Sequence, residues 1–101
     1  MSRRGIGQYT RKNGGIQRMK YRFEVETIVA ARGKLSREER HDVTQYFENT
    51  GIEADDAMKA YRMLSKQSAG RLSKESVEDK AIITLPDYGS CQVIVRAYAD
   101  N

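Results

Sequence analysis

The stretch 81-AIITLPDYGSCQVIVRAYA-99 decides the fold class of this chain. Two runs rich in β-branched residues flank the four-residue group Pro86–Gly89. Proline presets the backbone angle that opens a turn, and glycine accepts the positive φ angle that closes one. The sequence therefore predicts that residues 81–99 form an antiparallel β-hairpin.

Both faces of this hairpin carry apolar side chains. Ile82 and Ile94 alternate with the apolar residues of the first face, so they fall on the opposite face. An apolar patch left in contact with water is typical of a protein interface. Ile82, Ile94 and Tyr98 are therefore candidate contacts with a protein partner or with a second copy of the chain.

A second strand is predicted at 20-KYRFEVETIVAA-31, where apolar and charged residues alternate. A period of two is typical of a strand with one face buried and the other in water. The residues expected on the buried face are Phe23, Val25, Thr27 and Val29, and those expected on the solvent face are Arg22, Glu24 and Glu26.

The segment 35-LSREERHDVTQYFENTGI-52 predicts a helix with clear signals at both ends. Ser36 and Glu39 have the spacing of a capping box, in which each side chain accepts a hydrogen bond from the other residue's backbone N–H group. At the other end we expect Gly51 to adopt a left-handed conformation and Ile52 to fold back, as in a Schellman motif. The predicted apolar stripe consists of Val43, Tyr46 and Phe47.

Residues 53–67 predict a second helix, ending near Gly70, and the short turn between the helices predicts a helical hairpin. The polar segment 68–80 is expected to be a loop. The order is therefore strand, helix, helix, strand, strand. It predicts an α+β domain in which a small, mostly antiparallel sheet carries two helices on one face. With 101 residues, the chain has room for one compact domain, which we assign to residues 21–101.

The first 22 residues differ from the remainder in charge. They contain seven basic side chains and no acidic one, whereas the rest of the chain has 11 basic and 14 acidic residues. The net charge of +4 therefore combines a strongly basic segment with a slightly acidic body. Such asymmetry indicates a polyanionic partner.

We therefore assign residues 1–20 to a basic arm that contacts nucleic acid, RNA or DNA. Lysine and arginine neutralise phosphates, and a tyrosine ring can stack on an unpaired base. The residues predicted to make these contacts are Arg3, Arg4, Tyr9, Arg11, Lys12, Arg18, Lys20 and Arg22. The same segment has two alternative interpretations. It could be an arm that binds an acidic surface of another protein, or a tail that only keeps the protein in solution.

The arm has two predicted shapes. Asn13 and Gly14 form a strong short-range signal for a two-residue β-hairpin turn, which would pair Arg11 with Ile16 and make the arm a basic ribbon. The residues flanking the turn alternate poorly, however, and an isolated ribbon is only marginally stable in water. The other shape is a flexible arm that becomes ordered on contact with its partner.

Little in the sequence indicates catalysis, and we expect no enzyme activity, no cofactor, no metal and no small-molecule substrate. His41 is the only histidine and Cys91 the only cysteine. We interpret the first as a solvated helix residue and the second as a small buried side chain. Glu24 and Glu26 could hold a cation, but without a third ligand they are better explained as a solvated strand face.

The expected location is the cytoplasm, and no membrane association is expected. A single cysteine suits a reducing compartment, and no apolar run reaches the length that spans a bilayer. Two functions follow from the sequence. The first is a small non-enzymatic nucleic-acid-binding protein that uses its basic arm. The alternative is a protein-interaction module, either a homodimer or a small inhibitor, that docks on a larger machine through the hairpin at 81–99.

Overall fold

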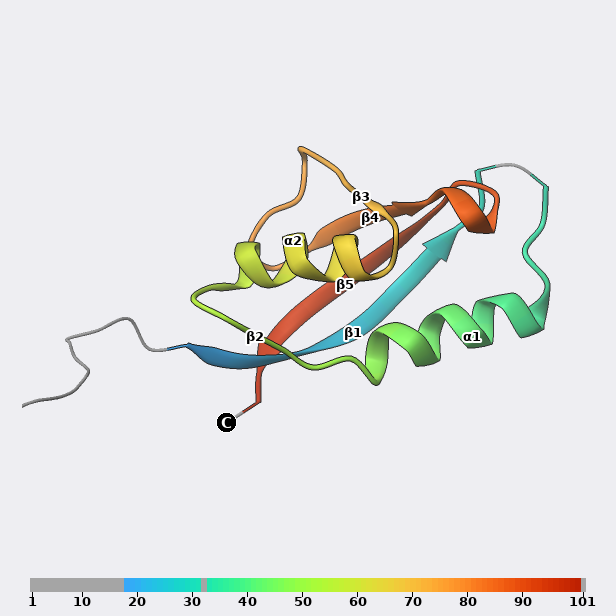
Figure 1. The fold of residues 1–101 in the computed structure, drawn as a ribbon. Helices are drawn as coiled ribbons and strands as arrows, with labels where there is room; N and C mark the ends of the chain where they lie inside the picture. Colours follow the sequence, from blue (N-terminus) through green and yellow to red (C-terminus); the bar gives the residue numbers. More distant parts are fainter. Residues whose placement is uncertain (1–17, 32, 101) are drawn as a thin grey trace, which may run out of the picture.

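The computed structural model describes residues 18–31 and 33–100 and has the predicted α+β class (Figure 1). Along the chain, the elements are β1 (Met19–Val29), α1 (Arg37–Glu48), β2 (Ile52–Ala54), α2 (Ala57–Gln67), β3 (Arg71–Leu72), β4 (Ala81–Leu85), η1 (Pro86–Tyr88) and β5 (Cys91–Ala99). Neither helix in the described part of the chain has the length and apolar character needed to cross a membrane.

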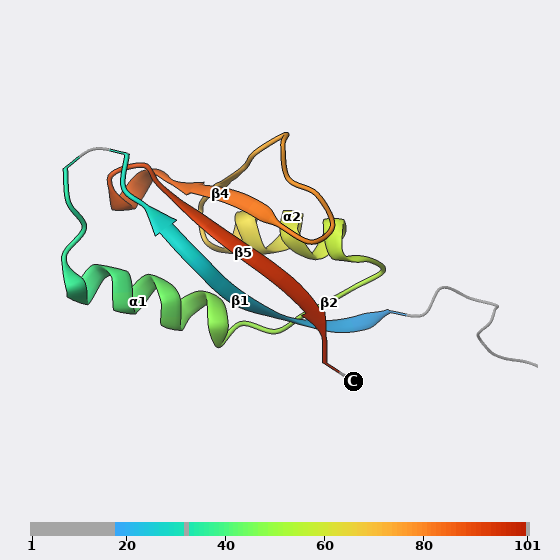
Figure 2. The same cartoon turned by 180° about the vertical axis from the view of Figure 1, so that it is seen from behind.

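The five strands form one sheet in the order β2-β1-β5-β4-β3, with every neighbouring pair antiparallel. In the two opposite views, α2 lies over β4 and β5 on one side of the sheet, while α1 runs beside β1 (Figures 1 and 2). The other face of the sheet faces the viewer in Figure 2. The predicted antiparallel sheet with two helices is confirmed.

The hairpin at 81–99 forms as predicted. Leu85 pairs with Cys91 at its closed end, and Pro86 begins the short 3-10 turn η1. Gly89 has a φ angle of 65°, in the left-handed region that glycine adopts at little cost. Alternate residues of both strands are buried in the core. In the strand order, β5 is the middle strand and β4 lies next to it.

One hydrophobic core joins the sheet to both helices. Phe23 of β1 packs against Tyr61 of α2, with ring centroids 6.2 Å apart. Val43 and Phe47 bring α1 into the same cluster. The largest fully buried side chains are Tyr61, Phe23, Phe47, Leu64, Ile83, Val93, Val95 and Cys91. Because all these elements share one cluster, the described residues from Tyr21 onwards pack as a unit.

The predicted alternation of β1 is wrong beyond Val25. The pairing with β5 shifts by one residue between Val25 and Thr27, which is a β-bulge. An extra residue exchanges the two faces of everything that follows it. Ile28 therefore packs against the core, whereas Val29, expected to be buried, is 47% exposed.

The predicted helical hairpin is also wrong, because β2 lies between the two helices. Ile52 and Ala54 are buried while Glu53 is exposed, and these three residues pair with the start of β1. Helix α1 ends at a cap residue, Asn49, with a φ angle of −94°, so Gly51 does not form the expected Schellman motif. A strand of three residues is too short for its alternation to be recognised in a sequence.

The Schellman motif is found at the end of α2 instead. Ala69 has a φ angle of 56°, and the N–H groups of Ala69 and Gly70 donate to the carbonyls of Lys66 and Ser65. A side chain at Gly70 would lie 2.7 Å from a methyl carbon of Ile83, so only glycine fits there. Gly70 directly precedes β3, which pairs with β4. The segment 68–80, predicted to be a loop, therefore contains a short strand.

Helix α1 begins with the predicted capping box, and two of its side chains bond to the edge of β1. Ser36 and Glu39 each accept a backbone hydrogen bond from the other, both at 3.0 Å. Further along, Arg40 donates to the carbonyl of Ile28, and Glu48 accepts from the N–H group of Val25. Both bonds satisfy backbone groups of β1 beyond the end of the short strand β2.

Tyr61 plays the corresponding part for β5. Its hydroxyl oxygen accepts from the N–H group of Ala97 at 2.9 Å and donates to the carbonyl of Glu78 at 2.8 Å. The last pair between β4 and β5 is Ala81 with Val95, so Ala97 has no β4 partner. The hydroxyl thus connects α2, β5 and the loop before β4.

We predict that Tyr61→Phe destabilises the fold. The substitution keeps the buried ring and removes only the hydroxyl, which leaves the N–H group of Ala97 without its partner. The expected loss in the free energy of unfolding is about 1–3 kcal/mol. Urea denaturation followed by circular dichroism measures it. Tyr46→Phe is the matched control, because Tyr46 is 44% exposed, and its effect should be within about 0.5 kcal/mol.

The same variant should change the pH dependence of stability. Burial raises the pKa of the Tyr61 hydroxyl above its ordinary value of 10.0. The unfolded chain therefore loses this proton first, so stability is intact below pH 10 and declines as the pH rises from there towards the native pKa. The stability difference between the natural protein and Tyr61→Phe should shrink above pH 10. A difference that grows there would contradict this account.

Candidate nucleic-acid interface

The predicted nucleic-acid contacts fall into two groups. One group lies outside the residues that the structure describes and contains Arg3, Arg4, Tyr9, Arg11 and Lys12. The predicted hairpin turn at Asn13 and Gly14 lies outside them too. The second group, Arg18, Lys20 and Arg22, lies at the start of β1, which begins at Met19 and so includes the end of the predicted arm.

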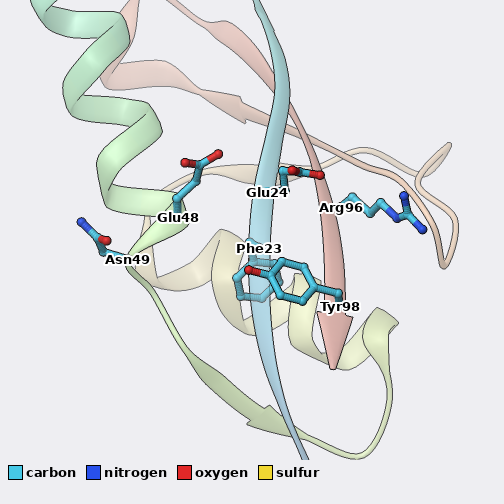
Figure 3. Close-up of a pocket in the computed structure, with 6 residues that line it drawn as sticks. All are labelled: Phe23, Glu24, Glu48, Asn49, Arg96 and Tyr98. Atoms are coloured by element: carbon cyan, nitrogen blue, oxygen red, sulfur yellow. The ribbon is translucent and has the colours of Figure 1, made fainter. Parts of the chain in front are cut away.

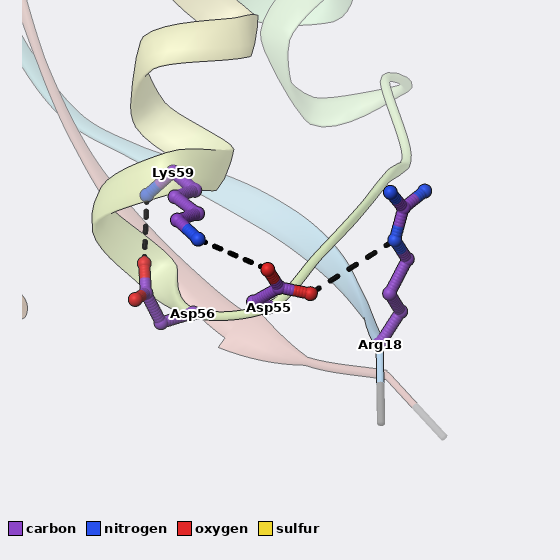
Figure 4. Close-up of polar contacts among 4 residues, drawn as sticks. All are labelled: Arg18, Asp55, Asp56 and Lys59. Carbon is purple, nitrogen blue, oxygen red and sulfur yellow. Dashed lines mark hydrogen bonds and ion pairs between the residues drawn. The ribbon is translucent and has the colours of Figure 1, made fainter. Parts of the chain in front are cut away.

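Arg18 lies beside the start of α2. Its Nε atom is 3.9 Å from Oδ1 of Asp55, while Oδ2 of the same carboxylate accepts from Lys59 at 3.0 Å (Figure 4). Asp56, the next residue, caps α2 by accepting from the backbone N–H of Lys59. The side chain of Arg18 is 70% exposed, and such solvated ion pairs contribute little to stability. Asp55 nevertheless keeps two cations close together.

Lys20 lies in β1 opposite Glu53 of β2, and both side chains are exposed. A lysine on a strand surface keeps its ammonium group in water, where an anion can reach it. Opposite charges on facing strands stabilise a sheet only slightly, by about 0.2–1 kcal/mol. Strand β1 therefore fixes the position of Lys20, but the stability of the fold depends little on its charge.

Arg22 is bonded within the fold. Its Nη2 atom donates to the backbone carbonyl of Glu48, at the end of α1, and its Nη1 atom is 3.4 Å from the carboxylate of Asp100. The last turn of α1 contains no basic residue of its own, so Arg22 supplies the positive charge that suits this negative end of the helix dipole. Its buried Nε atom has no hydrogen-bond partner among the described residues.

The predicted interface residues lie on the sheet face opposite to the helices. Ile82 and Ile94 face each other directly across β4 and β5, and both are half-buried. Tyr98, further along β5, is 50% exposed. The same face also carries the exposed carboxylates of Glu24 and Glu26. This sheet face therefore has a small apolar centre, and some of the residues around that centre are acidic.

A cleft of about 460 Å³ lies where the end of α1 meets this side of the sheet (Figure 3). Glu48 is the last residue of α1 and Asn49 its C-cap, Glu24 comes from β1, and Arg96 and Tyr98 come from β5, with Phe23 at the base. The carboxylate of Glu48 already accepts from the backbone of β1. The lining offers hydrogen-bonding groups of both charges but no cysteine, serine or histidine nucleophile.

His41 and Cys91 lie where the sequence predicts them. His41 is exposed on α1, and Cys91 is fully buried at the start of β5. Burial raises the pKa of the Cys91 thiol, which keeps it protonated and unreactive. Within residues 18–31 and 33–100, no three His, Cys, Asp or Glu side chains are grouped so that they could hold a metal ion.

Sequence reasoning missed two contacts that shape this region. The ion pair of Asp55 with Lys59 follows from their four-residue spacing across the start of α2, but the approach of Arg18 to Asp55 depends on the pairing of β1 with β2. The bonds of Arg22 depend on where α1 ends. No local pattern in the sequence encodes either distance.

Comparisons of the chain with known protein families, with curated proteins and with solved structures find no match.

Arg22 and Lys20 should therefore respond differently to mutation. We predict that Arg22→Gln lowers the free energy of unfolding by about 1–2 kcal/mol, because it removes a charged donor from the end of α1. Lys20→Gln, the matched control on the same strand, should change it by less than about 0.5 kcal/mol. Thermal denaturation of both variants measures the difference. If the two variants were equally stable, the hydrogen bonds of Arg22 would not contribute to the stability of the fold.

Proposed function

We propose that this protein binds nucleic acid, RNA or DNA, through the basic segment that leads into β1. The observation that carries the proposal is the charge of residues 2–22, which include seven basic side chains and not one acidic side chain. The remainder of the chain has an excess of acidic residues. A segment of this kind can neutralise several phosphates without a preformed pocket.

The described end of this segment supports the proposal. Arg18 and Lys20 are exposed, and their neighbouring carboxylates form at most weak, solvated pairs with them. A phosphate can therefore replace these carboxylates at little cost. Arg22 is the exception, since its guanidinium already bonds to Glu48 and Asp100. We assign the binding to the residues before it.

The sheet is a poor alternative platform for bases. RNA-binding sheets stack bases on exposed aromatic side chains. Here Tyr98 is exposed on the open face, but Glu24 and Glu26 lie on the same face and repel phosphate. The basic segment is therefore the better candidate for first contact with a polyanion.

The proposal predicts a steep dependence of affinity on salt. About five phosphate contacts with a single strand imply roughly hundredfold weaker binding at 200 mM than at 50 mM salt. Fluorescence anisotropy with a labelled single-stranded RNA and a duplex DNA measures it. In the 101-residue chain, substitution by glutamine at Arg3, Arg4, Arg11 and Lys12 should remove most of the binding and most of the salt dependence.

A matched control removes four positive charges elsewhere. Lys34, Arg37, Lys74 and Lys80 are exposed, and none of them forms an ion pair within the described part of the chain. Glutamine at these four positions should leave most of the affinity intact. Equal affinity in the two quadruple variants would mean that net charge alone, and not the basic segment, governs binding.

One observation favours a second candidate function, self-association through the open sheet face. Ile82 and Ile94 lie side by side there with no helix over them, and Tyr98 is exposed nearby. Apolar side chains in such a position are typical of an interface. A second copy would cover them with the same patch, as in a two-fold symmetric dimer.

This candidate predicts a dimer that Ile94→Glu dissociates. Light scattering should give a mass near twice that of the chain for the natural protein and the mass of a monomer for the variant. Gln45→Glu is the matched control, because Gln45 is exposed on α1 and lies outside the open sheet face. A natural protein that remains monomeric at high concentration would exclude this function for the open face.

A further inference from the structure

The exposed face of α2 is basic. Lys59, Arg62 and Lys66 lie at positions i, i+3 and i+7 and are all exposed, with Met63 between them at 41% exposure. Residues with this spacing share one side of a helix. The helix contains no acidic residue from Ala57 to Gln67. We call these four residues the α2 basic strip.

The strip differs from the other helical surface of the same protein. Helix α1 mixes its exposed Arg37 and Arg40 with the acidic residues Glu38, Glu39 and Asp42. A helix surface that serves only to keep the protein in water can carry both signs, as α1 does. The charged side chains of α2 are all positive, although residues 23–101 as a whole include more acidic than basic residues.

Two of the three cations lack an acidic partner. Lys59 bonds to Asp55, but within residues 18–31 and 33–100 neither Arg62 nor Lys66 forms an ion pair. Lys66 follows Arg62 by four positions, a rise of about 6 Å along the helix axis. The two side chains therefore present neighbouring positive charges that the fold does not use.

The strip is continuous with the basic segment before β1. Arg18, Lys59 and Met63 line one shallow cleft, which Glu53 and Asp55 also line, and the carboxylate of Asp55 lies between the two cations (Figure 4). The chain thus enters β1 at the start of the strip. A strand of nucleic acid that contacts Arg18 can continue along α2 towards Lys66 without crossing the open sheet face, which carries Glu24 and Glu26.

We propose that the α2 basic strip is a second contact surface for the phosphate backbone of the same nucleic acid. The inference rests on the proposed function, and it identifies Arg62 and Lys66 as binding residues. Met63 offers its apolar side chain between the two cations, where a sugar or the edge of an unpaired base can pack against it.

The test substitutes Arg62→Gln and Lys66→Gln together, because glutamine is a good helix former and removes only the charges. The probe is a labelled single-stranded RNA of about 16 nucleotides, the upper site size of a small binding domain. Loss of two phosphate contacts should weaken binding about tenfold and lower the slope of log affinity against log salt by about 1.4. The charge-retaining variant R62K/K66R should bind like the natural protein.

The matched control is K34Q/R37Q, which also removes two charges. Both residues are exposed and lie at the start of α1, at the end of the molecule opposite to the start of β1 (Figure 1). This pair should weaken binding by less than about threefold through long-range electrostatics alone. Circular dichroism of each variant establishes that it is folded before its affinity is compared.

The outcomes separate this inference from the function on which it rests. If R62Q/K66Q binds as tightly as K34Q/R37Q while the quadruple variant of the arm loses binding, the strip is not a contact surface and the proposed function stands. If the quadruple variant binds like the natural protein, the proposed function fails. A tenfold loss in R62Q/K66Q, restored in R62K/K66R, supports the strip.

Discussion

The unequal lengths of the strands impose the constraint on which the rest of this structure depends. Strands β1 and β5 run together for most of their length, but their outer neighbours β2 and β4 pair with only part of them. Backbone N–H and C=O groups left without a strand partner must find another one if they are shielded from water. Helix side chains supply it: Glu48 and Arg40 bond to β1, and Tyr61 bonds to β5. These bonds tie both helices to the sheet in addition to the apolar core.

The same arrangement separates the charges of the protein. The bulge in β1 turns Val29 outwards and leaves Glu24 and Glu26 on the open sheet face, together with the half-buried pair Ile82 and Ile94. Strand β2 brings Asp55 to the start of β1, so Arg18 approaches α2. The basic segment therefore enters the fold beside the one helix whose exposed face is free of acidic residues. This proximity is the physical basis for treating the arm and α2 as one surface for a polyanion.

Most of the elements could be predicted because their signals are local. Pro86 and Gly89 determine the turn of the hairpin through their own backbone angles, and Ser36 with Glu39 caps α1 within one turn. The strand at β1 was recognisable from its alternation, but its bulge was not, because a bulge depends on the register of the partner strand. Strands β2 and β3 are too short to show a period, and pairing with β1 and β4 stabilises them. The first helix was predicted to end in a left-handed glycine, yet that conformation occurs at Ala69, where the close approach of Gly70 to β4 requires the turn.

For the candidate interface, the sequence by itself determined the sign and the location of the charge, since counting basic and acidic residues requires no coordinates. It also determined the alternating apolar pattern that makes Ile82 and Ile94 share a face. Only the tertiary structure decided which basic residues are available. It bonds Arg22 to the end of α1, leaves Arg18 and Lys20 exposed, and brings Lys59 and Met63 of the α2 basic strip into one cleft with Arg18. The reason is that charge belongs to each residue, whereas the distance between residues far apart in the chain depends on strand pairing and on the packing of the core.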